Sequence, residues 1–415
     1  MKKALFDFLK NSPSAYQAVA NIRARLDKEG YTMLSEGEIT PASGKFYTVR
    51  GGTSIIAWRR DGKANGFMIS ATHSDSPAFR LKMNNETVGA YTRLDVERYG
   101  GMIMYSWLDR PLSLAGRVLV RCEGGVEERL VNIDRDLAVI PSVAIHLNRG
   151  VNDGYKFNPA TDMLPLLCSE SVSFREILES EAGGEVISHD LFLYNRDEPR
   201  SVGAKDELVL SPRIDDLASV FASLEGFLAA SDTSSVPVLA VFDNEEVGSE
   251  TKQGAASDML IHTLFSIGGD NYRSMLDGSL MLSADNAHAL HPNHPELSDK
   301  PNALLLGGGV AVKYNANQRY STDGLSAALF ETLCERARVK TQNYYNRADL
   351  PGGSTLGSIA NTTVGLPTVD IGVPQLAMHS ACECAALSDI VDMKNVMCTL
   401  FSSSIVKDGN KYSLT

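Results

Sequence analysis

Residues 236–246 read Val-Pro-Val-Leu-Ala-Val-Phe-Asp-Asn-Glu-Glu, an apolar run that ends directly in an acidic cluster. Similar runs recur along the chain. Residues 66–71 are followed by Thr72-His73-Ser74-Asp75, residues 279–284 by Asp285-Asn286, and residues 368–373, a little later, by Met378-His379-Ser380. Short apolar runs with little alternation are typical of strands that are buried on both faces of a parallel or mixed sheet.

Helical patterns lie between these runs. Apolar residues at helical spacing occur over 4–32, with a break at Ser12-Pro13-Ser14, and again over 217–228 and 325–337. Strands that alternate with helices predict an α/β sandwich. The stretch from about 88 to 205 differs, because it consists of short β-like pieces separated by loops rich in Gly, Asn, Asp and Pro. We therefore predict an α/β domain formed by residues 1–88 and 206–415, interrupted by a β-rich domain at 89–205.

Size and charge narrow the class of protein. The chain has 415 residues, more than one hydrophobic core usually covers, and a net charge of −12 without a run of Lys or Arg. Such a balance argues against a nucleic-acid partner, and no apolar stretch approaches the ~20 residues of a membrane span. Six sparse cysteines are typical of free thiols in a reducing compartment. We expect a soluble cytoplasmic protein.

Histidines and carboxylates follow the apolar runs repeatedly. In open α/β sheets the loops after the strands converge on one crevice, so these groups and the segment Ser211–Asp216 are expected to meet there. Two histidines and three carboxylates suit a centre of two divalent ions such as zinc, manganese or cobalt, if one carboxylate bridges them.

The Glu245-Glu246 pair is the most informative local feature. Adjacent carboxylates at a strand end diverge, so one can bind a metal while the other accepts a proton from water. By itself such a pair is more often a solvated acidic turn. In His73-Ser74-Asp75, the Asp has the spacing to support a metal-bound imidazole, although a capping Asp is the simpler interpretation of that motif alone.

Taken together, these motifs give the chain a strong resemblance to the aspartyl aminopeptidase family of dinuclear zinc metallopeptidases. The resemblance covers nearly the whole chain and is carried by ordered motifs: His73-Ser-Asp-Ser-Pro77, Tyr99-Gly-Gly101, Trp107-Leu-Asp-Arg110, Ala144-Ile-His-Leu147, Ser211-Pro-Arg-Ile-Asp215, Glu245-Glu-Val-Gly-Ser249, Ser283-Ala-Asp285, Asn315-Ala-Asn-Gln-Arg-Tyr320 and Met378-His-Ser380. It implies a three-layer α/β/α metallopeptidase domain with a mixed sheet, and a β-rich inserted domain that mediates dimerisation.

Carried over residue by residue, the resemblance implies the roles of the site. His73 and Asp285 would bind one metal ion, Glu246 and His379 the other, and Asp215 would bridge them. Glu245 would be the general base and Asp75 the partner of His73. The activity implied is removal of the first residue of a peptide.

The resemblance also bears on substrate and assembly. The family prefers an N-terminal Asp or Glu, and Lys313 resembles its acid-binding lysine. His146 resembles a histidine that reaches into the site of a neighbouring subunit, within a homododecamer built from dimers. Among the histidines of 288–294, His288 is the one expected to line the site.

Two alternatives remain open. One keeps the chemistry but changes the substrate: an aminopeptidase that prefers a neutral first residue such as Leu, or a related binuclear amidase or carboxypeptidase. The other is a catalytically silent shell or cargo-binding protein that retains the fold, against which the intact set of site residues argues.

Overall fold

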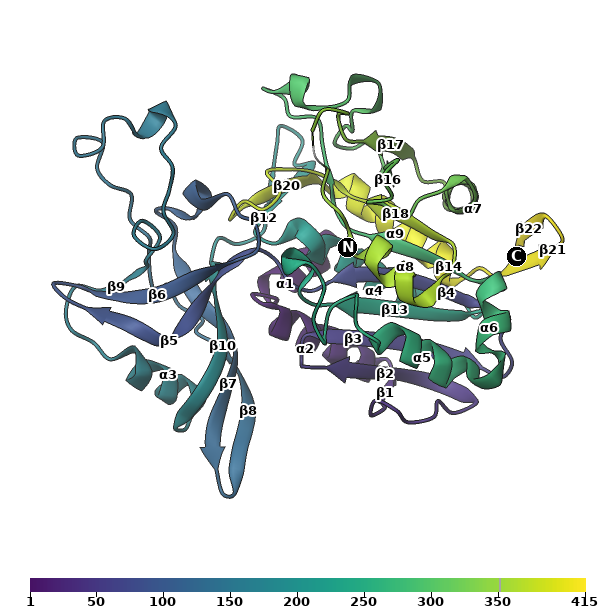
Figure 1. Ribbon diagram of the computed structural model, residues 1–415, viewed down its shortest axis with the longest axis horizontal. Coiled ribbons are helices and arrows are strands. Elements are labelled where there is room, and N and C mark those ends of the chain that lie inside the picture. Colours follow the sequence, from purple (N-terminus) through teal and green to yellow (C-terminus); the bar gives the residue numbers. More distant parts are fainter. Residues whose placement is uncertain (351) are drawn as a thin grey trace.

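The computed structural model describes residues 1–350 and 352–415. A mixed sheet of nine strands forms its centre, in the order β1-β2-β3-β13-β4-β14-β18-β16-β17 (Figure 1). The neighbouring strands β13, β4, β14 and β18 run parallel, whereas β3 and β16 are antiparallel to their neighbours β13 and β18. The bounds are β1 Thr32–Met33, β2 Ser43–Arg50, β3 Ser54–Asp61, β4 Phe67–His73, β13 Val236–Phe242, β14 Leu280–Ala284, β16 Val310–Tyr314, β17 Thr341–Tyr345 and β18 Thr368–Gly372.

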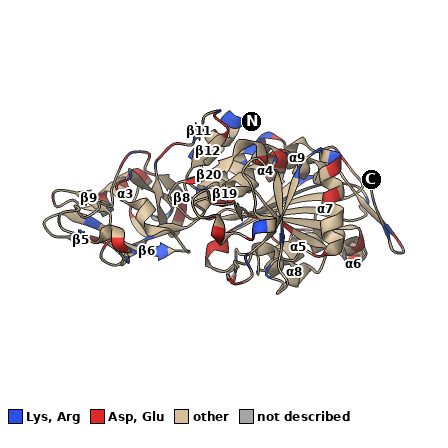
Figure 2. Cartoon of the chain, turned by 90° about the horizontal axis from the view of Figure 1, so that it is seen from above, with Lys and Arg blue, Asp and Glu red and all other residues tan. Residues whose placement is uncertain are grey.

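Helices cover both faces of this sheet, which Figure 2 shows edge-on between α4 and α9 on one side and α5 and α8 on the other. One face carries α1 Lys2–Lys10, α2 Ala15–Lys28, α4 Ile214–Ala229, α7 Gly324–Ala337 and α9 Leu387–Phe401; the other carries α5 Met259–Gly268, α6 Tyr272–Met275 and α8 Leu356–Val364. Strand β4 explains the layering, because Met68 packs in the first core and Phe67 and Ile69 pack in the second. The predicted three-layer α/β/α fold with a mixed sheet is confirmed.

A second sheet of six strands, in the order β8-β7-β10-β5-β6-β9, stands beside the first (Figure 1). Together with α3 Phe174–Ala182 it encloses a core of its own. Its strands are β5 Ala78–Val88, β6 Thr92–Tyr99, β7 Leu112–Cys122, β8 Gly125–Asn132, β9 Leu166–Cys168 and β10 Val186–Asn195.

The second sheet starts before the boundary expected at residue 88. Strand β5 pairs with β6 and β10, so the sheet begins at Ala78. The buried residues Phe79 and Leu81 alternate with Arg80 and Lys82, which is the pattern of a strand with one buried face and not that of the central sheet.

A small third sheet, in the order β11-β12-β20-β19-β15, was not expected from the apolar runs. Its strands are very short, from β11 Arg200–Val202 and β12 Leu208–Ser211 to β15 Ala287–His288, β19 Pro374–Leu376 and β20 Glu383–Ala386. It brings segments from distant parts of the chain beside the carboxyl ends of the central strands. The described chain closes with the hairpin β21 Ile405–Asp408 and β22 Lys411–Leu414.

Among the helices of the described residues, none is both long enough and apolar enough to span a membrane.

Candidate metal centre

The carboxyl ends of three neighbouring parallel strands carry the first residues of the site. His73 is the last residue of β4, Asp285 directly follows β14, and Glu245 and Glu246 lie in a 3₁₀ turn just after β13. Because β13, β4 and β14 are adjacent, their ends open on the same edge of the sheet. The sequence prediction that these groups converge is therefore met by the topology.

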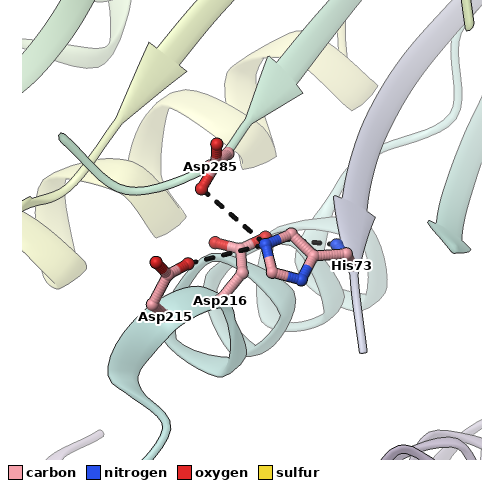
Figure 3. Close-up of side chains that lie close together, drawn as sticks. All are labelled: His73, Asp215, Asp216 and Asp285. Atoms are coloured by element: carbon pink, nitrogen blue, oxygen red, sulfur yellow. Dashed lines mark hydrogen bonds and ion pairs between the residues drawn. The ribbon is translucent and has the colours of Figure 1, made fainter. Parts of the chain in front are cut away.

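Asp215 joins this group from the start of α4, where Asp215 and Asp216 depart from helical backbone angles. Nε2 of His73 lies 3.5 Å from Oδ1 of Asp215 and 3.7 Å from Oδ1 of Asp285 (Figure 3). The His73 and Asp215 side chains are almost fully buried. One imidazole nitrogen thus faces two carboxylates.

Asp215 also faces a second group. Its Oδ2 lies 3.6 Å from Nε2 of His379, and that nitrogen lies 3.3 Å from Oε2 of Glu246. The two oxygens of Asp215 therefore point to different histidines. Ligand atoms of His73, Asp215, Asp216 and Asp285 lie within 4.8 Å of one another, as do those of Asp215, Glu246 and His379.

Unpaired buried oxygens show that these residues fit metal ions. Oδ1 of Asp215, Oδ1 of Asp216 and Oε1 of Glu246 are buried and have no hydrogen-bond partner among the residues that the structure describes. A buried carboxylate oxygen without a partner is costly, and a divalent cation would compensate it. Imidazole and carboxylate are ligands that zinc accepts.

The pKa values reflect the same crowding of acids. Burial and the neighbouring Asp215 raise the pKa of Glu246 well above its usual value. Burial also raises the pKa of Glu245 to about 8. Burial alone would lower the pKa of His73, but Asp215, Asp285 and Asp75 around its ring raise it well above its usual value. Without cations, such a cluster holds protons.

Asp75 supports the site from behind His73. Its Oδ1 lies 3.3 Å from Nδ1 of His73, on the side of the ring opposite Asp215. The carboxylate also accepts hydrogen bonds from the hydroxyl of Tyr99 at 2.7 Å and from the backbone amides of Glu245 and Glu246 at 3.2 Å each. Asp75 thus orients both the imidazole and the turn that carries the two glutamates.

Two further acids approach the site. Asp216 is buried, and its Oδ2 accepts a hydrogen bond from the backbone amide of His73 at 3.2 Å. Glu383 lies buried at the start of β20 and accepts from the backbone amides of Asp215 and His379. No apolar run directly precedes Glu383, which lies between Cys382 and Cys384, so the sequence pattern that pointed to the other acids did not point to this one.

The three predicted substrate residues lie differently. Lys313 on β16 is buried, and its ammonium lies 3.4 Å from Oδ2 of Asp285. Partial removal from water and the charge of Lys313 lower the pKa of His288, although much of its side chain still contacts solvent. His146 is exposed in the long loop between β8 and β9 and belongs to none of the candidate ligand groups.

Cys382 and Cys384 flank Glu383, and burial raises the pKa of both thiols. Such thiols are poor metal ligands because the thiolate is the binding form.

Fold and site together define a class. A three-layer α/β/α domain that gathers histidines and carboxylates at the carboxyl ends of its parallel strands, around a shared aspartate, is a metal-dependent hydrolase.

Comparison with known proteins identifies the family. The family model described as aminopeptidase I zinc metalloprotease (M18) matches residues 8–401. The chain is 40% identical over 409 residues to a probable M18 family aminopeptidase 2 of Clostridium novyi, covering 93% of this chain and 94% of that protein. The chain belongs to the M18 family and is a metallo-aminopeptidase.

Solved structures agree with this assignment. One chain in the structure of the Ape4 and Nbr1 complex superposes with a TM-score of 0.92 at 32% identity, over 97% of this chain and 85% of that chain. The S. cerevisiae mApe1 dodecamer superposes with a TM-score of 0.81 at 25% identity, over 96% of each chain.

Proposed function

We propose that this aminopeptidase holds two divalent ions, zinc in the first instance, and uses them to release the first residue of peptides. His73 and Asp285 would hold one ion, Glu246 and His379 the other, and Asp215 would be shared. The observation that carries this proposal is the position of Asp215, whose Oδ1 and Oδ2 face His73 and His379 respectively.

The chain's own residues supply the proton transfer. Bound at such a site, a divalent ion would supply polarisation of the scissile carbonyl and a lowered pKa of water. Glu245 then takes the proton that the attacking water loses and returns it to the leaving amine. Burial raises the pKa of Glu245, which strengthens it as a proton acceptor, and the positive charge of bound metal ions would keep it ionised until it takes the proton. Asp75 keeps His73 and the Glu245 turn in place.

We further propose a preference for Asp or Glu as the first residue, with Lys313 as the cation that receives the acidic side chain. Lys313 lies within the site, beside Asp285. The same contact favours the alternative of a neutral residue such as Leu, because Asp285 already compensates the charge of Lys313. The preference therefore depends on whether Lys313 can pair with the acidic side chain of the substrate while it contacts Asp285.

Initial rates on Asp-, Glu- and Leu-p-nitroanilide test these points, measured on zinc-loaded and on chelator-stripped enzyme. We expect chelation to abolish turnover, and Lys313→Met to lower the rates on Asp- and Glu-p-nitroanilide more than the rate on Leu-p-nitroanilide. Lys205→Met, at an exposed position, is the matched control. A preference for Leu in the unmodified enzyme would refute the acidic pocket, and cleavage of N-acetylated peptides would refute the exopeptidase assignment.

We also propose that the protein self-associates into dimers and a dodecamer, with the second sheet as the contact unit. The solved S. cerevisiae relative is a dodecamer. The loop that carries His146 exposes Val143, Ile145 and Leu147, the last to 83%, and clustered exposed apolar residues favour burial against another copy.

Six free cysteines support residence in a reducing compartment such as the cytoplasm.

A further inference from the structure

Glu383 connects the two loops that carry proposed metal ligands. Its side chain is buried, with a residue exposure of only 2%. Its Oε2 accepts a hydrogen bond from the backbone amide of Asp215 at 2.9 Å, and its Oε1 accepts one from the backbone amide of His379 at 2.7 Å. One carboxylate therefore holds the backbones of two residues that are far apart in the sequence.

Both of these amides lie in irregular backbone. His379 has a φ of +65°, in the left-handed region that non-glycine residues rarely adopt. Asp215 interrupts the first turn of α4 with non-helical angles. Neither amide can be satisfied by a regular helix or strand, so each needs a side-chain acceptor, which Glu383 provides.

Glu383 is itself held in position by regular structure. It begins β20 and pairs in register with Ser211 at the end of β12, shortly before Asp215 in the chain. The side-chain amide of Gln375, on the neighbouring strand β19, donates from Nε2 to Oε1 of Glu383 at 3.5 Å. The small third sheet therefore acts as the rigid base from which this carboxylate reaches both loops.

We infer that Glu383 is a positioning residue that sets the separation of Asp215 and His379 and thereby the affinity of the site for metal. It would act through these two residues and not as a ligand, because both of its oxygens are directed to backbone amides. The inference depends on the proposed function only for the roles of Asp215 and His379.

The variant Glu383→Gln tests this role with almost no change in volume. Its NH₂ group must face one of the two backbone N–H groups, and two donors cannot form a hydrogen bond. We expect zinc affinity to fall by about 10–100-fold, as measured by competition with a chromophoric chelator. The visible absorption of the cobalt-substituted protein should change as well, since the coordination geometry at His379 would shift.

Asp389 offers a matched control for the loss of such an acceptor. It is fully buried and accepts from the backbone amides of Gly307 and Gly309 at 2.7 and 3.0 Å, but it contacts no proposed ligand. Asp389→Asn should lower thermal stability while leaving zinc affinity and the cobalt spectrum unchanged. If Glu383→Gln behaves in the same way as Asp389→Asn, the positioning role is refuted.

Two further variants keep the test decisive. Glu383→Asp is the substitute if Glu383→Gln does not fold. It retains both oxygens but is shorter, so we expect it to fold and to bind zinc more weakly. Wild-type zinc affinity in Glu383→Asp would refute the inference. His379→Ala tests the ligand assignment separately. Undiminished zinc binding in His379→Ala would refute the proposed ligand set, whereas a loss there with wild-type affinity in the Glu383 variants would refute only the role of Glu383.

Discussion

Glu245 and Glu246 are neighbours in sequence but have different surroundings. Glu246 points to His379, with 3.3 Å between Oε2 and Nε2, and keeps its other oxygen without a hydrogen bond among the described residues. Glu245 forms no ion pair within the described part of the chain, and burial raises its pKa to about 8. Both residues lie in the same tight 3₁₀ turn, and their different neighbours suit the proposed roles of Glu246 as a ligand and Glu245 as the base.

We predict that Glu245→Gln lowers turnover by about 10²–10⁴-fold, the usual contribution of a general base. Metal content should stay the same, because Gln removes only the group that accepts the proton. Initial rates on p-nitroanilides together with metal analysis of the purified variant measure both quantities. Turnover close to that of the unmodified enzyme would mean that another group is the base.

Zinc affinity should depend on pH. In the metal-free protein the pKa values of Glu246 and His73 are raised, so protons compete with metal for both groups up to a higher pH than they would at free side chains. Raising the pH from about 6 to about 8 removes this competition, and the dissociation constant should therefore fall. Calorimetry in two buffers of different ionisation enthalpy should detect proton release at pH ~7. Affinity that does not change with pH would contradict this prediction.

At the level of elements, the site depends on how closely the ends of β14 and β18 approach. The two strands are parallel neighbours, and the amide of Asp285 donates to the carbonyl of Ile371 at 3.1 Å. Gly372 lies just beyond that contact, and a Cβ atom there would be 2.2 Å from the backbone oxygen of Asp285. Only a residue without a side chain allows this approach.

Gly372→Ala should therefore push Asp285 away from the site. We expect a loss of about 1–3 kcal/mol in the free energy of unfolding of the metal-free protein, as for other overpacked positions, and weaker zinc binding in addition. Denaturant unfolding and zinc titration measure the two effects. Gly125→Ala is the control, since a Cβ at Gly125 would meet no atom within 4 Å; equal behaviour of both variants would disprove the role of this contact.

At the level of the whole molecule, the second sheet contributes to the site of the first. The segment that follows β6 lies against the His379 loop: the amide of Ile103 donates to the carbonyl of His379 at 3.0 Å, and the hydroxyl of Ser106 accepts from the amide of Ala381 at 2.8 Å. Tyr99, at the end of β6, donates to Asp75. The proposed association through the second sheet would therefore be linked directly to the candidate metal centre.

We predict a solution mass many times the 44.9 kDa of one chain, measured by light scattering. His146→Ala should lower turnover without changing metal content or mass, because the residue is exposed here and would complete a neighbouring site. A fully active monomer would contradict both the assembly and this role of His146.

The sequence alone was sufficient for the family, the main layers and the convergence of the acidic and imidazole groups. The strands β4 and β13 follow the predicted runs closely, because burial on both faces of a sheet demands continuous apolar runs. The helices α1 and α2 also lie on either side of Ser12-Pro13-Ser14, as predicted. His73, Asp285 and the Glu245-Glu246 pair could be found because each follows such a run. A parallel sheet brings strand ends together whatever the intervening loops contain.

Tertiary structure alone decided the positions that depend on pairing between distant segments. The strands of the third sheet are too short to give a periodic signal, so the sequence did not predict that β12 pairs with β20. It therefore could not predict that Glu383 lies between Asp215 and His379. Contacts between distant segments also decide that the second sheet starts at Ala78 and that Lys313 pairs with Asp285. Local patterns record which residues are buried, whereas long-range contacts determine which buried groups meet.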